Sequence, residues 1–513
     1  MKKCLLFVFF CIELFFSPNA VAQNRNSIWI FGDSAGIDFV NGVPLAGSSV
    51  VDSRGTCTSI ADSSSNLLFY TGNDPNYNSF PAYVQRGIVY TKSNTVMDNG
   101  DSLISVGWYN EHIIITNPKG DNTFFLFNVG ATYGLHTGLF VSVVDLNYNM
   151  GLGRVTVKNR PLIDSVIFAD ALGAVKQGNG RDWWVVSKPL FRNSTSLVPS
   201  DTFYVYLVTP DSIHAPIKQR IGTDRGWGLA NLTFSPTGDK LNLIMSDGII
   251  EVFDFNRCTG ILSNANIIYN TPLFPNGNNA FTGSAFSPNG NFLYVTQGAN
   301  LPPYYILQID LSNNDIDTVA QVTSFGTSFT RGTGALRLAP DGKIYIATVA
   351  RDSNGGIWFP YPSNFYSPDN MYLATIDSPD VKGVGCSYNP YSFYLGGKRC
   401  YFGLPNNPDY ELGALAGSGC DTLTNLTPDP SPLEKGVRIY PNPVSNELRI
   451  MSYNFRIKKL NVTDMLGNII LEKNINNQES NIKINVSSLQ SGVYFAKVFG
   501  ESGVAVRKFV KAP

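Results

Sequence analysis

The motif FSPTGDKLNL at Phe234–Leu243 returns as FSPNGNFLYV at Phe286–Val295 and as LAPDGKIYI at Leu338–Ile346. Successive copies lie 52 residues apart. Each copy predicts the end of one strand, a Pro-x-Gly turn and a second strand, because proline presets φ and glycine accepts a positive φ. The motif is therefore typical of a β-hairpin that recurs at a fixed period.

Weaker copies of this hairpin extend the repeat in both directions. The equivalent turn positions are Ser65, Gly120, Gly180, Gly238, Gly290, Gly342 and Gly397. A repeat of roughly fifty residues with four strand-sized runs is typical of a propeller blade, whereas a β-solenoid would have periods of about 20 to 30 residues. The sequence thus predicts an all-β fold with a seven-bladed β-propeller over residues 23–410. We expect Ser27–Phe31 to supply the outer strand of the seventh blade and so to protect an open edge.

Composition agrees with many short strands joined by tight turns. Aromatic residues make up 12% of the chain and charged residues 15%, with 47 Gly and 30 Pro among 513 residues. The hydrophobic share of 43% excludes a disordered chain. The formal net charge is −1, so no overall positive field attracts nucleic acid or an anionic membrane. We expect no nucleic-acid partner.

The N-terminus has the three parts of a signal peptide. Lys2 and Lys3 precede the apolar run Leu5–Phe16, and the small-residue sequence Ala20–Ala22 follows it. The sequence predicts a signal peptide over residues 1–22, with cleavage after Ala22. The apolar run is too short to span a bilayer, and we expect no transmembrane segment.

Five cysteines remain after the expected cleavage, namely Cys57, Cys258, Cys386, Cys400 and Cys420. Their number is odd and none forms a CxxC pair, which argues against a zinc site. Cys57 and Cys386 occupy similar places in the first and seventh blades, so a disulfide across the closure of the ring is one expectation. Pairing of Cys400 with Cys386 or with Cys420, or five free thiols, are the alternatives.

The last hundred residues change character. Residues 411–435 are rich in Gly, Ala, Ser, Thr and Pro, which predicts a linker. Residues 436–513 then show seven short apolar runs separated by turn residues, which predicts a compact antiparallel β-sandwich. The runs are Val437–Tyr440, Leu448–Ile450, Ile457–Val462, Ile469–Leu471, Ile482–Val486, Val493–Val498 and Ala505–Val510.

The repeated hairpins resemble the WD-like and YVTN-type repeats of bacterial seven-bladed propellers. The opening segment Ile28–Phe39, followed by Gly55–Cys57 and Asn66–Thr71, is similar to the start of secreted propellers of Bacteroidota. The resemblance covers roughly residues 24–410, and it implies a fold without implying a ligand.

The C-terminal module resembles a type IX secretion C-terminal sorting domain, type A. The residues that carry the resemblance are Tyr440, Pro441, Asn442, Pro443, Gly467, Gly492, Tyr494 and Lys508. It implies passage through the periplasm, recognition by the outer-membrane translocon, and removal of the domain by a sorting peptidase as the protein is attached to the surface or released. The alternative is an adhesive β-sandwich that stays attached.

One enzymatic pattern competes with this interpretation. Ser34 in Phe31–Ser34 resembles the nucleophile block of GDSL-type esterases, and Asp211 with His214 resembles their Asp-x-x-His block. A serine hydrolase needs a base beside the hydroxyl and a carboxylate that orients the base. Those esterases have an α/β fold, however, and this chain repeats β-hairpins.

The best candidate for ligand binding is Trp358, Phe359 and Tyr361, which open a long loop rich in Pro and Asn. Core packing is the alternative for each aromatic residue. The sequence favours an exported propeller that binds an unknown carbohydrate or protein ligand, with no cofactor and no metal. The alternative function is a hydrolase or lyase whose site lies in the central channel, with clustered carboxyl groups of shifted pKa as its signature.

Overall fold

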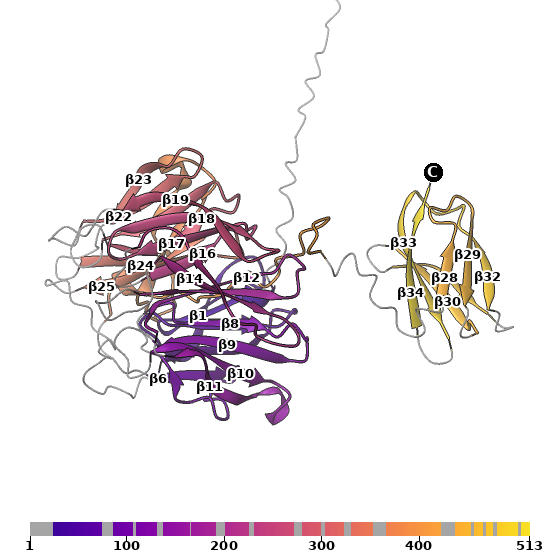
Figure 1. Cartoon of the computed structure of the whole chain (residues 1–513), viewed down its shortest axis with the longest axis horizontal. Helices are drawn as coiled ribbons and strands as arrows, with labels where there is room; N and C mark the ends of the chain where they lie inside the picture. The colour runs from indigo at the N-terminus through magenta and orange to yellow at the C-terminus, as the bar shows by residue number, and fades with distance from the viewer. Residues whose placement is uncertain are drawn as a thin grey trace, which may run out of the picture. The chain divides into compact units, whose positions relative to one another are not determined.

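The structure is a computed structural model that describes most of the chain. The described residues are 24–73, 86–105, 109–130, 137–164, 166–190, 201–224, 230–270, 280–298, 303–322, 330–351, 366–421, 437–452, 456–464, 468–475, 480–500 and 504–512. The expected signal peptide lies outside them. The chain divides into two units, Met1–Cys420 and Asp421–Pro513 (Figure 1). No helix in the described ranges is long and apolar enough to cross a membrane.

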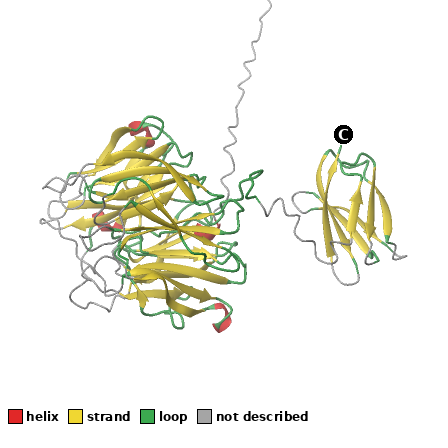
Figure 2. Ribbon diagram, in the orientation of Figure 1, coloured by secondary structure: helices red, strands yellow, loops and turns green. Residues whose placement is uncertain are grey.

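Both units are all-β, with small antiparallel sheets and very little helix (Figure 2). The short helical turns are three 3-10 segments, Asn24–Asn26, Asn149–Gly151 and Gly383–Cys386, and the α-helix α1 (Pro368–Met371). This confirms the all-β class that the hairpin repeat predicts.

Five four-stranded sheets follow one another along the first unit, each made of four consecutive strands in order. They contain β8 (His112–Thr116), β9 (Thr123–Gly130), β10 (Gly138–Asp145) and β11 (Arg154–Asp164); β12 (Phe168–Lys176), β13 (Trp183–Pro189), β14 (Thr202–Val208) and β15 (Ile217–Arg220); β16 (Ala230–Phe234), β17 (Lys240–Met245), β18 (Ile249–Asn256) and β19 (Ile261–Asn270); β20 (Phe281–Phe286), β21 (Phe292–Gln297), β22 (Tyr304–Asp310) and β23 (Asp315–Val322); and β24 (Thr330–Leu338), β25 (Ile344–Arg351), β26 (Tyr372–Ile376) and β27 (Tyr388–Tyr394).

A seven-stranded sheet holds the N-terminal strands of the first unit. Its strands are β1 (Ile28–Phe31), β2 (Asp33–Asp38), β3 (Leu45–Asp52), β4 (Thr58–Ala61), β5 (Leu67–Asn73), β6 (Arg86–Thr91) and β7 (Leu103–Ile104). A single residue pair, Asp52 with Asn73, joins β3 to β5. The sheet therefore consists of two parts, β1–β3 and β4–β7, whose strands are paired with each other at this one position only.

The hairpin turns lie where the repeat predicts them. Six of the seven turn positions, Ser65 to Gly342, have positive φ, from 68° at Ser65 to 80° at Gly342. Ser65 lies between β4 and β5, and the other five lie between the first two strands of the four-stranded sheets. Gly397 is the exception, because it lies after β27 and no second strand follows it. That part of the repeat assignment is wrong.

Residues 399–412, which we name the axial segment, bond to the start of β2 and to the residues before β1. The Asp33 N–H donates to Arg399 O at 2.9 Å, and Asn407 Nδ2 donates to Asn26 Oδ1 at 2.9 Å. β1 itself pairs with β2, and β2 pairs with β3. β1 stands at the end of the strand order of its sheet and its residues Trp29–Phe31 are buried, so Ser27–Phe31 is not the exposed outer strand that the sequence predicts.

The first strands of the sheets lie in the core of the first unit. Every residue of β12 and β20 is buried, whereas β11 and β19 expose much of their length. Neighbouring first strands contact one another, β12 with β16 and β20 with both β16 and β24. A strand buried on both faces is mostly apolar, and β12 and β20 follow this rule apart from Asp170, Lys176, Thr282 and Ser284.

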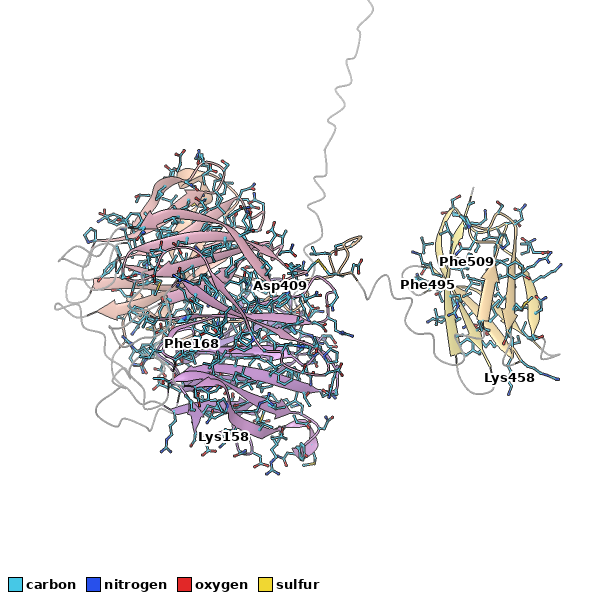
Figure 3. All side chains as sticks on the ribbon, viewed as in Figure 1. Lys158, Phe168, Asp409, Lys458, Phe495 and Phe509 are labelled. Carbon is cyan, nitrogen blue, oxygen red and sulfur yellow. A yellow bond between two sulfur atoms is a disulfide. The ribbon has the colours of Figure 1, made fainter. Side chains whose placement is uncertain are left out.

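The second unit has one three-stranded and one four-stranded sheet. The strands are β28 (Val437–Tyr440), β29 (Glu447–Ser452) and β32 (Asn481–Asn485), and β31 (Ile469–Asn474), β30 (Lys459–Thr463), β33 (Gly492–Phe499) and β34 (Val504–Lys511). All seven match the apolar runs in the sequence. One core cluster takes residues from both sheets, including Leu448, Ile482, Val462 and Phe509 (Figure 3).

The structure corrects the cysteine pairing and extends the first unit. Cys258 and Cys420 form a disulfide, whereas Cys57, Cys386 and Cys400 are buried free thiols. The expected Cys57–Cys386 bridge is absent, and the three alternatives, the two pairings of Cys400 and five free thiols, are wrong as well. The disulfide keeps residues 411–420, which composition assigns to the linker, with the first unit.

Candidate functional site

Asn406 of the axial segment makes hydrogen bonds to residues of several different strands. Its N–H donates to Cys57 O at 2.9 Å, and its Nδ2 donates to His112 O at 3.1 Å and Leu172 O at 3.0 Å. These acceptors lie beside β4, in β8 and in β12. Four residues further on, the Tyr410 hydroxyl donates to Ile114 O at 3.0 Å. The axial segment thus joins β8 and β12 to the residue before β4.

Arg337 of β24 also bonds to the axial segment, next to and at Asn406. Its Nη2 donates to Asn110 Oδ1 at 2.7 Å and to Asn406 Oδ1 at 3.0 Å, and its Nε donates to Pro405 O at 3.1 Å. Nη1 makes one long bond of 3.4 Å, to Leu336 O. Burial lowers the pKa of Arg337 to about 10, so the guanidinium stays charged at neutral pH. All four acceptors are uncharged.

An axial pocket of about 110 Å³ lies beside Arg337 and Asn406 and opens to solvent. Five first strands line it, together with residues of the axial segment. The lining residues are Asn26, Ile113, Gly173, Ala174, Val175, Leu232, Thr233, Phe234, Ser235, Pro236, Ala285, Phe286, Leu336, Arg337, Leu338, Asn406, Asn407, Pro408, Asp409 and Leu412. The walls are thus mostly apolar.

Asp409 is the one carboxyl group among these lining residues. It lies on the side of the first unit where the chain runs on to Cys420 (Figure 3). Burial raises the pKa of Asp409 from its ordinary value, and the neighbouring Glu411 adds to the rise while Arg257 opposes it.

Two buried carboxyl groups lie outside the lining of this pocket, Glu111 directly before β8 and Asp170 within β12. Burial raises the pKa of Asp170 to about 8, the charge of Glu111 adds to the rise, and Arg54 opposes it. Asp170 Oδ1 accepts the Ala230 N–H at 3.3 Å, and Glu111 Oε2 accepts the Ser105 hydroxyl at 3.0 Å. Neither residue lines the axial pocket. The pair can hold a proton near neutral pH.

The aromatic binding residues predicted from sequence, Trp358, Phe359 and Tyr361, lie outside the described residues. The structure does not bring the esterase residues together. Ser34 lies in β2 and bonds Asp33, whereas His214 is exposed after β14 and bonds Thr209 and Ser212. Within the described ranges no group of three His, Cys, Asp or Glu residues has the arrangement of a metal site.

The sorting residues come together in the second unit although they are far apart in sequence. Asn442 follows Tyr440 and Pro441 after β28, its Nδ2 donates to Lys508 O at 3.3 Å, and its Oδ1 accepts the Val510 N–H at 2.8 Å. The Pro441-Asn442-Pro443 turn is thereby joined to β34.

The remaining sorting residues lie on the same sheet. The ring of Tyr494 stacks on Phe509 with centroids 5.7 Å apart, and Gly492 pairs with Lys511. Gly467 lies outside the described residues. Gly492, Tyr494 and Lys508 therefore lie on the paired strands β33 and β34, and the turn after β28 is bonded to β34.

Sequence reasoning missed Arg337 and Asn406. The repeat contains a signal for the first: the residue before the Phe/Leu-x-Pro-x-Gly motif is Thr233 in one copy, Ala285 in the next and Arg337 in the third. A charge at a position that is small or neutral in the other copies marks a departure from core packing. Asn406 has no such signal, because its partners are carbonyl groups of distant strands.

Replacing Asn406 with alanine is expected to destabilise the first unit by about 3 kcal/mol, because it leaves buried carbonyl groups and a guanidinium N–H without partners. Chemical denaturation measures the change. Asn313→Ala, in an exposed turn between β22 and β23, is the matched control and should change stability little. Equal effects of the two substitutions would contradict the central role of Asn406.

The raised pKa of Asp170 predicts a pH dependence. Between pH 4 and pH 8 the folded state keeps the proton that the unfolded state has lost, so the Asp170 contribution to stability falls as pH rises. Asp170→Asn removes this loss. Thermal unfolding of both proteins should show the variant gaining relative stability from pH 5 to pH 8 and levelling off above, while other groups such as Asp52 cancel in the comparison. A difference independent of pH would refute the assignment.

The comparisons divide between the two units. Residues 438–512 match the family of secretion system C-terminal sorting domains. No curated protein matches the chain.

Solved structures similar to the chain include three proteins of low sequence identity. A protein of Bacteroides uniformis assigned as a 6-phosphogluconolactonase is 13% identical, with 66% of this chain and 95% of that chain covered and a TM-score of 0.40. The periplasmic gluconolactonase of Pseudomonas aeruginosa is 14% identical, with 64% of this chain and 93% of that chain covered and a TM-score of 0.38. An auxiliary nutrient binding protein of Bacteroides thetaiotaomicron is 12% identical, with 59% of this chain and 68% of that chain covered and a TM-score of 0.34.

The sorting-domain match settles where the protein is delivered. A C-terminal domain of this family directs its chain through type IX secretion and implies contact with the type IX machinery. The protein is therefore secreted by this route to the cell surface or released from it.

Proposed function

We propose that the chain is an exported binding protein whose first unit is a seven-bladed β-propeller. Five blades correspond to the four-stranded sheets. The seven-stranded sheet supplies two more, because β4–β7 forms one blade and β1–β3 with the axial segment forms the other. The last blade is thus made from both ends of the first unit, an arrangement that closes a ring and leaves no exposed edge.

The axial pocket is the observation that carries the binding role. Its described lining has no histidine or cysteine and one carboxyl group, Asp409. Apolar walls with a few polar groups at fixed places are typical of small-ligand sites, and the residues present offer binding rather than acid–base chemistry. The aromatic residues Trp358, Phe359 and Tyr361 remain our proposed contacts for a larger carbohydrate or protein ligand.

A screen of the mature chain, from residue 23 onward, against glycans and peptides tests the binding role. We expect saturable binding that survives Asp170→Asn, since Asp170 lies outside the pocket. Turnover of a bound compound that this substitution abolishes would instead support an enzyme.

The second candidate, a hydrolase or lyase, is favoured by the pair Asp170 and Glu111. A carboxyl group with a pKa of about 8, here Asp170, can donate a proton at neutral pH, and the charge of Glu111 contributes to this raised pKa. Under this alternative, Asp170→Asn and Glu111→Gln should each reduce turnover by at least a hundredfold without unfolding the protein. Activity unchanged in both variants would exclude it.

Processing completes the proposal. We propose that residues 1–22 direct export to the periplasm, and that a sorting peptidase removes the second unit, a β-sandwich, during attachment or release. The common core of its two sheets supports an independent fold for this unit. Mass spectrometry of the protein from its host should find a chain that begins at Gln23 and ends before Val437.

A further inference from the structure

The guanidinium of Arg337 is charged, buried and without an ionic partner. Its hydrogen-bond acceptors are Asn110, Asn406 and two backbone carbonyl groups, and no ion pair in the described part of the chain includes it. Burying a charge without a counter-ion is costly, and carboxylates are the usual partners of buried arginine.

The titratable neighbours of Arg337 do not supply a negative charge. Tyr109 and Cys57 interact electrostatically with it, and burial raises the pKa of each far above neutral pH. Both side chains are therefore uncharged. Arg337 therefore brings a net positive charge to the lining of the axial pocket.

One N–H of this guanidinium remains available. Nη1 carries two N–H bonds and makes only the long contact with Leu336 O, so the second N–H has no acceptor among the described residues. The pocket that Arg337 lines is otherwise walled largely by apolar groups, including Ala174, Leu232 and Phe286. The arrangement combines one buried cation with a small apolar chamber that opens to solvent.

We propose that the axial pocket binds a small organic carboxylate, with its carboxylate group toward Arg337 Nη1 and its apolar chain against the walls. The inference names a ligand class for the pocket and rests on the proposed binding function. A carboxylate matches an N–H donor of arginine in charge and geometry. The volume of about 110 Å³ is smaller than the roughly 150 Å³ cavity that accommodates benzene, so an acid of about four carbons is a suitable probe.

Calorimetric titration of the mature chain with sodium butyrate, in a buffer free of other small anions, tests the proposal. Butyramide, which has the same shape without the charge, is the comparison ligand. We expect one butyrate per chain and at least tenfold weaker binding of butyramide. Equal affinities, or no butyrate binding, would overturn the proposal, and so would sulfate or chloride binding as tightly as butyrate.

Two variants locate the site. Arg337→Gln should abolish the preference for butyrate, but it also removes bonds that hold the axial segment. Ala174→Leu keeps those bonds and fills the pocket, so it should reduce butyrate affinity at least tenfold in a folded protein. Arg154→Gln, at an exposed arginine, is the control and should leave affinity unchanged. Full affinity in folded Ala174→Leu would place butyrate elsewhere and refute the proposal.

The outcome is distinguishable from failure of the proposed function. A glycan or peptide ligand found in the screen, together with no butyrate binding, would reject the carboxylate pocket alone. Butyrate binding with no larger ligand would keep the pocket and reject the larger-ligand part of the proposal.

Discussion

Deleting residues 436–513 is expected to reduce the protein at the cell surface and in the medium to background, while export to the periplasm continues. The deleted segment contains the whole sorting-domain match, 438–512. The first unit should fold normally without it, because the core of the second unit contains no residue of the first. Cell fractionation with surface proteolysis measures the distribution.

Two controls sharpen this deletion. Asn442→Ala removes the two hydrogen bonds that join the turn after β28 to β34, and we expect it to lower surface delivery in part. Lys483→Ala, on a different strand, should have little effect. Truncated chain appearing at the surface in normal amount would refute sorting by this module.

Replacing Cys258 and Cys420 with serine is expected to lower the free energy of unfolding of the first unit by about 5 kcal/mol in the chain-entropy model. The residues are 162 apart in sequence, so the disulfide removes much freedom from the unfolded chain. For a unit of this size the loss corresponds to a fall in melting temperature of about 6 °C. Thermal and denaturant unfolding measure both quantities.

Truncation gives the matched comparison. A chain ending at residue 421 keeps the disulfide and the bond from Arg257 Nη2 to Gly413 O, whereas a chain ending at Tyr410 loses both. We expect both to fold, the shorter with stability similar to or below that of the double serine variant. A change smaller than 1 kcal/mol in the serine variant would show that the bridge adds little to stability.

The hairpins were predictable because their turns depend on local chemistry. A Pro-x-Gly sequence specifies backbone angles within a few residues, and the structure has positive φ at Gly238, Gly290 and Gly342 as expected. The strands of the second unit were predictable because short apolar runs between turn residues are also a local pattern. Gly397 was misassigned because a Gly-Gly pair predicts a turn without showing whether a strand follows it.

The candidate site was less predictable than the fold. The acidic pair Asp170 and Glu111 acquires its chemistry from burial and proximity, neither of which the sequence expresses. The disulfide was missed because Cys420 follows a stretch whose Gly, Ala and Ser content is typical of a linker, although backbone bonds such as Leu415 N–H to Gly178 O fix it in place.

The bonds between the N-terminal residues and the axial segment set an order of events in folding. Asp33 and Arg399, which form an ion pair, are 366 residues apart, and Asn26 and Asn407 are 381 apart. In a chain that is exported from its N-terminus, Asn26 and Asp33 lack these partners until nearly all of the first unit has followed. Contacts between residues this far apart form slowly, and until then the N-terminal strands are open to other chains. The residues that complete the first unit are thus the last of that unit to enter the periplasm. A chain whose residue 407 has not yet entered would need protection from aggregation.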